Sequence, residues 1–84
     1  IAEGYKGDEV EFQVRFAREF IEKEHIDYFV FGHRHVPFDV QIAENSRVIN
    51  VGDWIVNYTY AVWDGNTLEI HSIYPKNEGN ILRK

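Results

Sequence analysis

The stretch GDEVEFQVRFAREFIEKEHIDYFVFG, residues 7–32, predicts a helix that leads directly into a buried strand. Asp8 followed three residues later by Glu11 is a capping-box pattern, which predicts that the helix starts at Asp8 and ends near His25. Because its apolar residues cover roughly half of the helix surface, we expect the helix to lie on a sheet. These residues form two adjacent stripes at helical spacing, Val10, Val14, Ala17 and Ile21 in one and Phe12, Phe16 and Phe20 in the other.

The segment after this helix is continuously apolar. Residues 28–31, YFVF, show no alternation, which is typical of a strand that is covered on both faces, as in parallel sheets. A helix that runs into such a strand is half of a βαβ unit. We therefore expect the strand that precedes the helix to lie outside this chain.

Beyond Pro37 the pattern predicts short strands joined by turns. The dipeptide Asp64-Gly65 is a strong hairpin signal because glycine tolerates a positive φ. The polar tail from Lys76 onward should fray. The predicted fold class is α/β, with one helix, a buried strand and then an antiparallel meander. The segments expected to form the meander are 38–43, 47–51, 57–63 and 67–74.

Size and composition limit what the chain can be. Its 84 residues make at most one small domain, yet 44% are hydrophobic and 15% aromatic. We interpret this surplus of ring surface as a face for the remainder of its own polypeptide, without which the chain should self-associate. The net charge of −5 and the lack of a basic patch argue against nucleic acid. The composition fits a cytoplasmic protein, and no apolar run approaches the roughly 20 residues that span a bilayer.

Two histidines, His33 and His35, follow the predicted buried strand directly. Ligands of open α/β sheets bind beyond the carboxyl ends of the strands. In an extended segment these two side chains would share one side, with Cα atoms about 6.5 Å apart. They could then bind two metal ions or converge on one, and Gly32 would give the backbone room to turn. The alternative is a pair of surface histidines without a ligand.

The segment FGHRH, residues 31–35, resembles the Gly-His-x-His motif of the calcineurin-like metallophosphoesterases. The downstream segments RVINVGDW (47–54) and YAVWDGNTLEI (60–70) resemble the UDP-2,3-diacylglucosamine hydrolase branch of that family. The resemblance covers residues 8–74. It implies that residues 1–84 are the C-terminal part of a single domain, a four-layer αββα sandwich.

The resemblance also implies a chemistry. Family members hydrolyse phosphoric esters or pyrophosphates with two divalent metal ions, usually manganese, and His33 and His35 would each bind one of them. The other metal ligands would lie outside this chain, so the chain alone should be inactive. The implied substrate is a small nucleotide-lipid of lipid A biosynthesis, and the enzyme would be peripheral to the inner membrane. The alternatives are another metallophosphoesterase, acting on a phosphomonoester or a cyclic nucleotide, or a non-catalytic scaffold.

Three further residues have two interpretations each. Arg34 could contact a substrate phosphate or form a surface ion pair. Asp53 could orient a metal-binding histidine or belong to a turn. Trp54 could line the substrate cleft, although we expect it to pack in the core.

Overall fold

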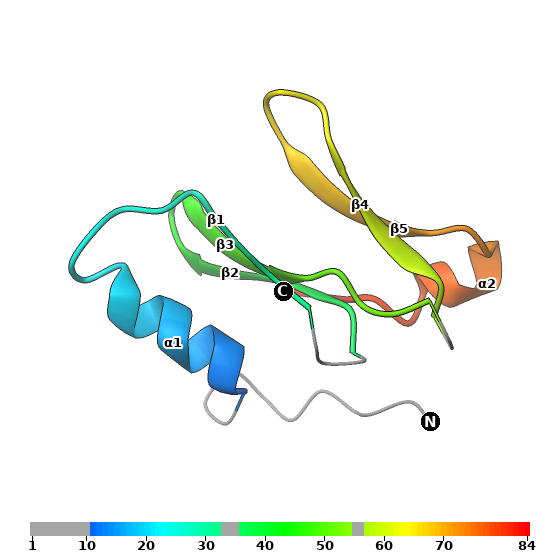
Figure 1. Cartoon of the computed structure of the whole chain (residues 1–84), viewed down its shortest axis with the longest axis horizontal. Coiled ribbons are helices and arrows are strands. Elements are labelled where there is room, and N and C mark those ends of the chain that lie inside the picture. Colours follow the sequence, from blue (N-terminus) through cyan, green and yellow to red (C-terminus); the bar gives the residue numbers. More distant parts are fainter. Residues whose placement is uncertain (1–10, 33–35, 55–56) are drawn as a thin grey trace.

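The computed structural model describes residues 11–32, 36–54 and 57–84 of the chain. They form a mixed α/β structure with two helices and six strands (Figure 1). The elements in chain order are α1 (Phe12–Phe20), β1 (Tyr28–Phe31), β2 (Phe38–Ala43), β3 (Ser46–Asn50), β4 (Thr59–Trp63), β5 (Leu68–Ser72), α2 (Pro75–Glu78) and β6 (Leu82–Arg83).

The strands make two sheets. One has four strands in the order β1-β3-β2-β6, and the other is the β4–β5 hairpin. β1 runs parallel to β3, β2 runs antiparallel to β3, and β6 runs parallel to β2. The predicted single meander is therefore wrong, because β2 and β3 pair in one sheet while β4 and β5 form another. The fold class α/β is confirmed.

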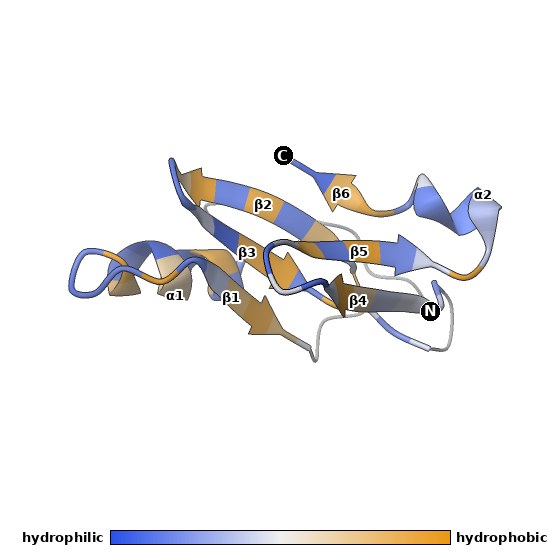
Figure 2. Cartoon of the chain, turned by 90° about the horizontal axis from the view of Figure 1, so that it is seen from above, coloured by the Kyte–Doolittle hydropathy of each residue, from blue (hydrophilic) through white to orange (hydrophobic). Residues whose placement is uncertain are grey.

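Alternating side chains along the strands separate two apolar clusters. Helix α1 covers one face of the four-stranded sheet, and the β4–β5 hairpin lies over the other face (Figure 1). Figure 2 shows alternating hydropathy along β2 and β5, but not along β1 or β3. The buried residues on the helix side are Val14, Ala17, Phe29, Val36, Phe38, Val40 and Val48, and those on the hairpin side are Ile49, Ile70 and Ile81.

Helix α1 is shorter than the sequence predicts. Glu11 has extended backbone angles (φ −73°, ψ 116°) and precedes the first helical residue, so it cannot be the third residue of a capping box. The predicted start at Asp8, which lies outside the described residues, is therefore wrong. The helix ends at Phe20, because the N–H of Lys23 bonds to the carbonyl of Phe20, three residues back, and tightens the chain into turns.

The two predicted stripes of α1 have different environments. Val14 and Ala17 are completely buried against the sheet. By contrast, Phe12 is 73% exposed and Phe16 is 44% exposed, although Phe16 also meets Phe31 edge to face at 6.2 Å. Phe20 of the same stripe is partly buried and meets Phe29 at 6.1 Å, so the described residues leave the second stripe largely uncovered at Phe12 and Phe16 only.

Strand β1 is an edge strand of the described sheet, with β3 as its neighbour. Phe29 is buried beneath α1, but Val30, which points to the other face, is 53% exposed. The hairpin covers that face only at Tyr28, whose ring meets Trp63 at 5.9 Å. The prediction that residues 28–31 are covered on both faces does not hold within the described residues.

The C-terminal segment is more ordered than its polar composition predicts. Residues Pro75–Glu78 form α2, and β6 pairs with the beginning of β2. Ile81 is buried against β5, so the predicted fraying from Lys76 is wrong. The predicted turn at Asp64-Gly65 is confirmed, with φ +94° at Gly65. In the described residues, no helix has the length and hydrophobicity needed to cross a membrane.

Candidate functional site

Three of the four predicted site residues, His33, Arg34 and His35, lie outside the described residues. Asp53 lies within them, as does Gly32, the residue from which the histidine segment continues. The described residues thus include the edge of the sheet at which the histidine segment begins.

The two motif-bearing segments leave the sheet at the same edge. β1 and β3 are parallel neighbours, with Phe31 opposite Asn50 in the register. The pairing continues one residue further, where the N–H of Val51 donates to the carbonyl of Phe31 at 2.9 Å. Because parallel strands end on the same side, the segment after β1 and the segment after β3 begin side by side.

A pair of buried amides lies at this edge. Gln13 Nε2 donates to the carbonyl oxygen of Gly32 at 2.8 Å, and Asn50 Nδ2 donates to the same oxygen at 3.1 Å. Asn50 Nδ2 also donates to Gln13 Oε1 at 2.8 Å. Sequence analysis missed both amides. Their only signal is a polar residue within the apolar face of a helix and another within an apolar strand.

The turn that follows β3 depends on Gly52. Its φ is +82°, and a β-carbon there would collide with the hydroxyl of Thr59. That hydroxyl donates to the carbonyl of Val51 at 2.8 Å and accepts from the N–H of Asp53 at 3.2 Å. The hydroxyl therefore fills the space that a side chain at position 52 would need.

Asp53 is nearly buried in the same turn. Its Oδ1 accepts from the backbone N–H of Asn57 at 3.2 Å and from Asn57 Nδ2 at 2.9 Å. The carbonyl of Asn57 in turn accepts from the hydroxyl of Ser72 at 2.6 Å. These bonds give Asp53 the turn role that the sequence left open. A second role in orienting a histidine remains a prediction.

Trp54 is 59% exposed, so its predicted packing in the core is wrong. Its ring meets Tyr58 at 5.5 Å, and Tyr58 meets Tyr74 edge to face at 5.4 Å. Tyr58 has φ +53°, a conformation that is uncommon for a residue with a side chain. An exposed aromatic group thus directly follows Asp53, which leaves the cleft alternative for Trp54 in place.

Within residues 11–32, 36–54 and 57–84, no three His, Cys, Asp or Glu side chains lie close enough to hold a metal ion. The donors that the sequence offers at this edge are the imidazoles of His33 and His35. Imidazole nitrogen suits first-row transition metals, whereas harder divalent cations also need oxygen donors. The donor chemistry therefore fits a metal site that is completed by ligands from elsewhere.

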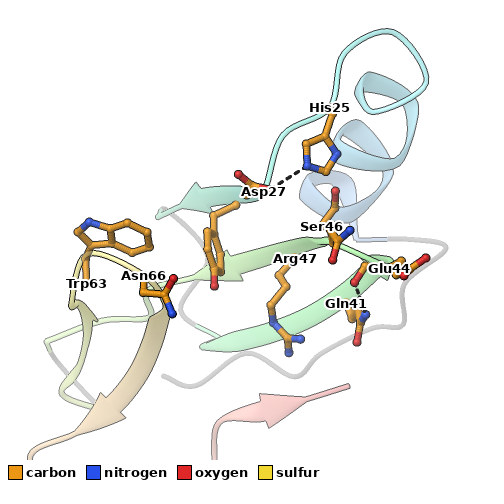
Figure 3. A pocket seen from close by; sticks show the side chains of 10 residues that line it. His25, Asp27, Gln41, Glu44, Ser46, Arg47, Trp63 and Asn66 are labelled. Atoms are coloured by element: carbon orange, nitrogen blue, oxygen red, sulfur yellow. Dashed lines mark hydrogen bonds and ion pairs between the residues drawn. The ribbon is translucent and has the colours of Figure 1, made fainter.

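A hollow of about 470 Å³ lies at the opposite end of β1 (Figure 3). His25 Nε2 and Asp27 Oδ1 lie 2.7 Å apart on its rim, and both side chains are exposed. Trp63 and Asn66 of the hairpin line it as well. Since α1 ends at Phe20, His25 does not end the helix as predicted. The hollow is separate from the edge where the histidine segment begins.

The chain is similar to a known enzyme. It is 42% identical over 66 residues to the UDP-2,3-diacylglucosamine hydrolase of Porphyromonas gingivalis (strain ATCC BAA-308 / W83). The match takes in 77% of this chain and 25% of that protein, so the chain spans about a quarter of the length of the curated relative it matches. A match of that length contains residues 33–54 wherever it begins. No family model and no solved structure matches the chain.

Proposed function

We propose that the chain is the C-terminal part of a metal-dependent hydrolase that cleaves the pyrophosphate of UDP-2,3-diacylglucosamine. The observation that carries the proposal is the 42% identity with the P. gingivalis enzyme of that name. The identity agrees with the motif resemblance of residues 31–35 and 47–54. The parallel pairing of β1 and β3 supports it further, because these two segments then begin at one edge.

The proposal includes the fold of the whole domain. The four-stranded sheet lies between helix α1 on one face and the β4–β5 hairpin on the other, so the described elements are stacked in the order helix, sheet, sheet. This order supports their being three layers of a four-layer αββα sandwich. The remaining strands and the outer helices would come from the rest of the polypeptide, which would cover the free edge of β1.

His33 and His35 would hold one metal ion each through neutral imidazole nitrogens, with manganese as the proposed metal. Bound metal ions would activate water and stabilise the charge that develops on the phosphate. Arg34 would add a positive charge for the substrate phosphate, and the Asp53 turn would bring the segment after β3 to the same edge. The product nucleotide would be UMP, and the enzyme would act in lipid A synthesis, in the cytoplasm and peripheral to the inner membrane.

The test compares histidine variants of the full-length protein. His33→Ala and His35→Ala should each abolish most release of UMP from UDP-2,3-diacylglucosamine in the presence of manganese. His25→Ala is the matched control, because His25 is an exposed histidine at the far end of β1 and should retain normal turnover. Arg34→Ala should lose less than either metal-ligand variant, since a phosphate contact is easier to replace than a metal ligand.

Three outcomes would contradict the proposal. A folded His35→Ala protein with near-normal turnover would remove the assignment of His35 as a metal ligand. A wild-type protein that hydrolyses a phosphomonoester or a cyclic nucleotide, but not UDP-2,3-diacylglucosamine, would assign it to another branch of metallophosphoesterases. A wild-type protein with no hydrolytic activity would favour a scaffold.

A further inference from the structure

The carbonyl oxygen of Gly32 accepts two side-chain hydrogen bonds from different elements. One donor is Gln13 Nε2 of α1 at 2.8 Å, and the other is Asn50 Nδ2 at the end of β3 at 3.1 Å. The two amides are also bonded to each other, Asn50 Nδ2 to Gln13 Oε1 at 2.8 Å. The helix, the edge strand and its neighbour therefore meet at one backbone atom.

The hydrogen bonds fix the orientation of both amides. Asn50 Oδ1 accepts the N–H of Gly52 at 2.9 Å, so a flipped amide would turn its NH₂ group toward another donor. A flipped Gln13 would likewise turn its oxygen toward the Gly32 carbonyl oxygen. The side chain of Asn50 also bonds to both segments that leave the sheet here, to Gly32 after β1 and to Gly52 after β3.

A contribution to the stability of the core does not by itself explain why two amide side chains are buried here. Asn50 is completely buried and Gln13 nearly so, beside the fully buried Val14 and Ala17. Buried amides add little to stability compared with apolar side chains of similar shape, even when all their hydrogen bonds are made. They do, however, provide directional contacts, which apolar side chains cannot.

Gly32 has no side chain through which packing could hold it. A β-carbon built at this position meets no atom within 4 Å, and φ is not in the left-handed region, so sterics do not require glycine here. The predicted role of Gly32 in a sharp turn thus finds no support from its backbone angle. Because a peptide unit is planar, donors that fix the Gly32 oxygen fix the whole peptide unit that Gly32 shares with the next residue.

We propose that Gln13 and Asn50 are positioning residues for the metal ligands. They hold the peptide unit at which the segment His33–His35 begins, and Asn50 couples that unit to the turn after β3. The proposal rests on the proposed function, in which this segment supplies two metal ligands. It identifies α1, which carries no ligand itself, as an element on which metal affinity depends.

The experiment measures manganese binding by the full-length protein directly, through the electron paramagnetic resonance signal of free Mn²⁺. Gln13→Met and Asn50→Leu remove the donors with little change in shape. Each should weaken manganese binding about tenfold or more, the range found when groups that orient metal ligands are removed. The carbonyl ¹³C shift of Gly32 in labelled protein should move in both variants, because it reports the lost hydrogen bonds.

Ser46→Ala is the matched control. Ser46 is also buried on β3, and its hydroxyl donates to the carbonyl of Ile26 at 2.7 Å, just before β1 begins. This variant removes a side-chain bond between β3 and the segment that leads into β1, at the opposite end of the same pair of strands. It should lose stability while keeping wild-type manganese affinity, which separates a positioning role from a structural one.

The outcomes distinguish this proposal from the proposed function. If His35→Ala loses manganese but folded Gln13→Met binds it as wild type does, the positioning role is overturned and the function stands. If the wild type binds no manganese, or His35→Ala binds it normally, both proposals fall. Should Asn50→Leu not fold, Gln13→Met decides the question, because residue 13 lies in the first turn of α1.

Discussion

Replacing Gly52 by alanine should destabilise the folded protein by about 3–4 kcal/mol. The left-handed φ of +82° alone costs a residue with a side chain about 1–2 kcal/mol. The new β-carbon would also displace the Thr59 hydroxyl, which bonds to the Val51 carbonyl and the Asp53 N–H. Losing these two bonds adds about 1 kcal/mol each. Urea unfolding followed by circular dichroism measures the difference.

Two comparisons separate the contributions to this loss. Gly65 has a similar φ of +94° but open space around it, so Gly65→Ala should cost only the conformational part, about 1–2 kcal/mol. In a Thr59→Ala background the hydroxyl is already absent, and the additional cost of Gly52→Ala should shrink. It should remain above the conformational part, because the new β-carbon still lies 3.0 Å from the β-carbon of Pro37. If Gly52→Ala and Gly65→Ala lowered the free energy of unfolding equally, the collision with the Thr59 hydroxyl would not contribute as argued.

Three further predictions concern the isolated chain. It should self-associate at micromolar concentration in light scattering, because the described residues leave Phe12, Phe16 and the edge of β1 uncovered; a stable monomer would show that these surfaces need no partner. Calorimetry should show only weak manganese binding, since two imidazoles without carboxylates suit this metal poorly, and a tight dinuclear site would contradict this. The N–H groups of Thr67 and Asn66 lower the pKa of Asp64, so its contribution to stability is present above the ordinary pKa of 3.8 and is lost as the pH falls below it. The protection of the turn amides, measured as the exchange rate relative to the intrinsic rate at each pH, should therefore fall in acid, and in Asp64→Asn this change in protection should disappear.

The sequence correctly predicts those structural features that depend on residues close together in the chain. The spacing of Val14 and Ala17 identified the buried face of α1, because helical periodicity is a local property. The strand at residues 38–43 and the hairpin turn at Asp64-Gly65 carry equally local signals, and the structure confirms both.

The sequence does not predict those structural features that depend on contacts between residues far apart in the chain. The insertion of β3 between β1 and β2 depends on which edges pair, and alternation within each strand does not encode that choice. The polar composition from Lys76 onward predicts a frayed tail, yet burial of Ile81 and pairing of β6 with β2 hold it in place. The hydrogen bond between Gln13 and Asn50 joins residues 37 positions apart, so no local sequence pattern predicts it.

The register of β3 specifies both the core and the proposed site. Val48 packs on the helix side and Ile49 on the hairpin side, so Asn50 faces α1 and its amide reaches Gln13. A slip by one residue would move every side chain of β3 to the opposite face. It would turn Asn50 away from Gly32 and, in the same step, exchange the environments of Val48 and Ile49. The apolar pattern that stabilises the sheet thus also sets the Asn50 amide beside Gly32, so the proposed positioning role of Asn50 depends on the packing of the core.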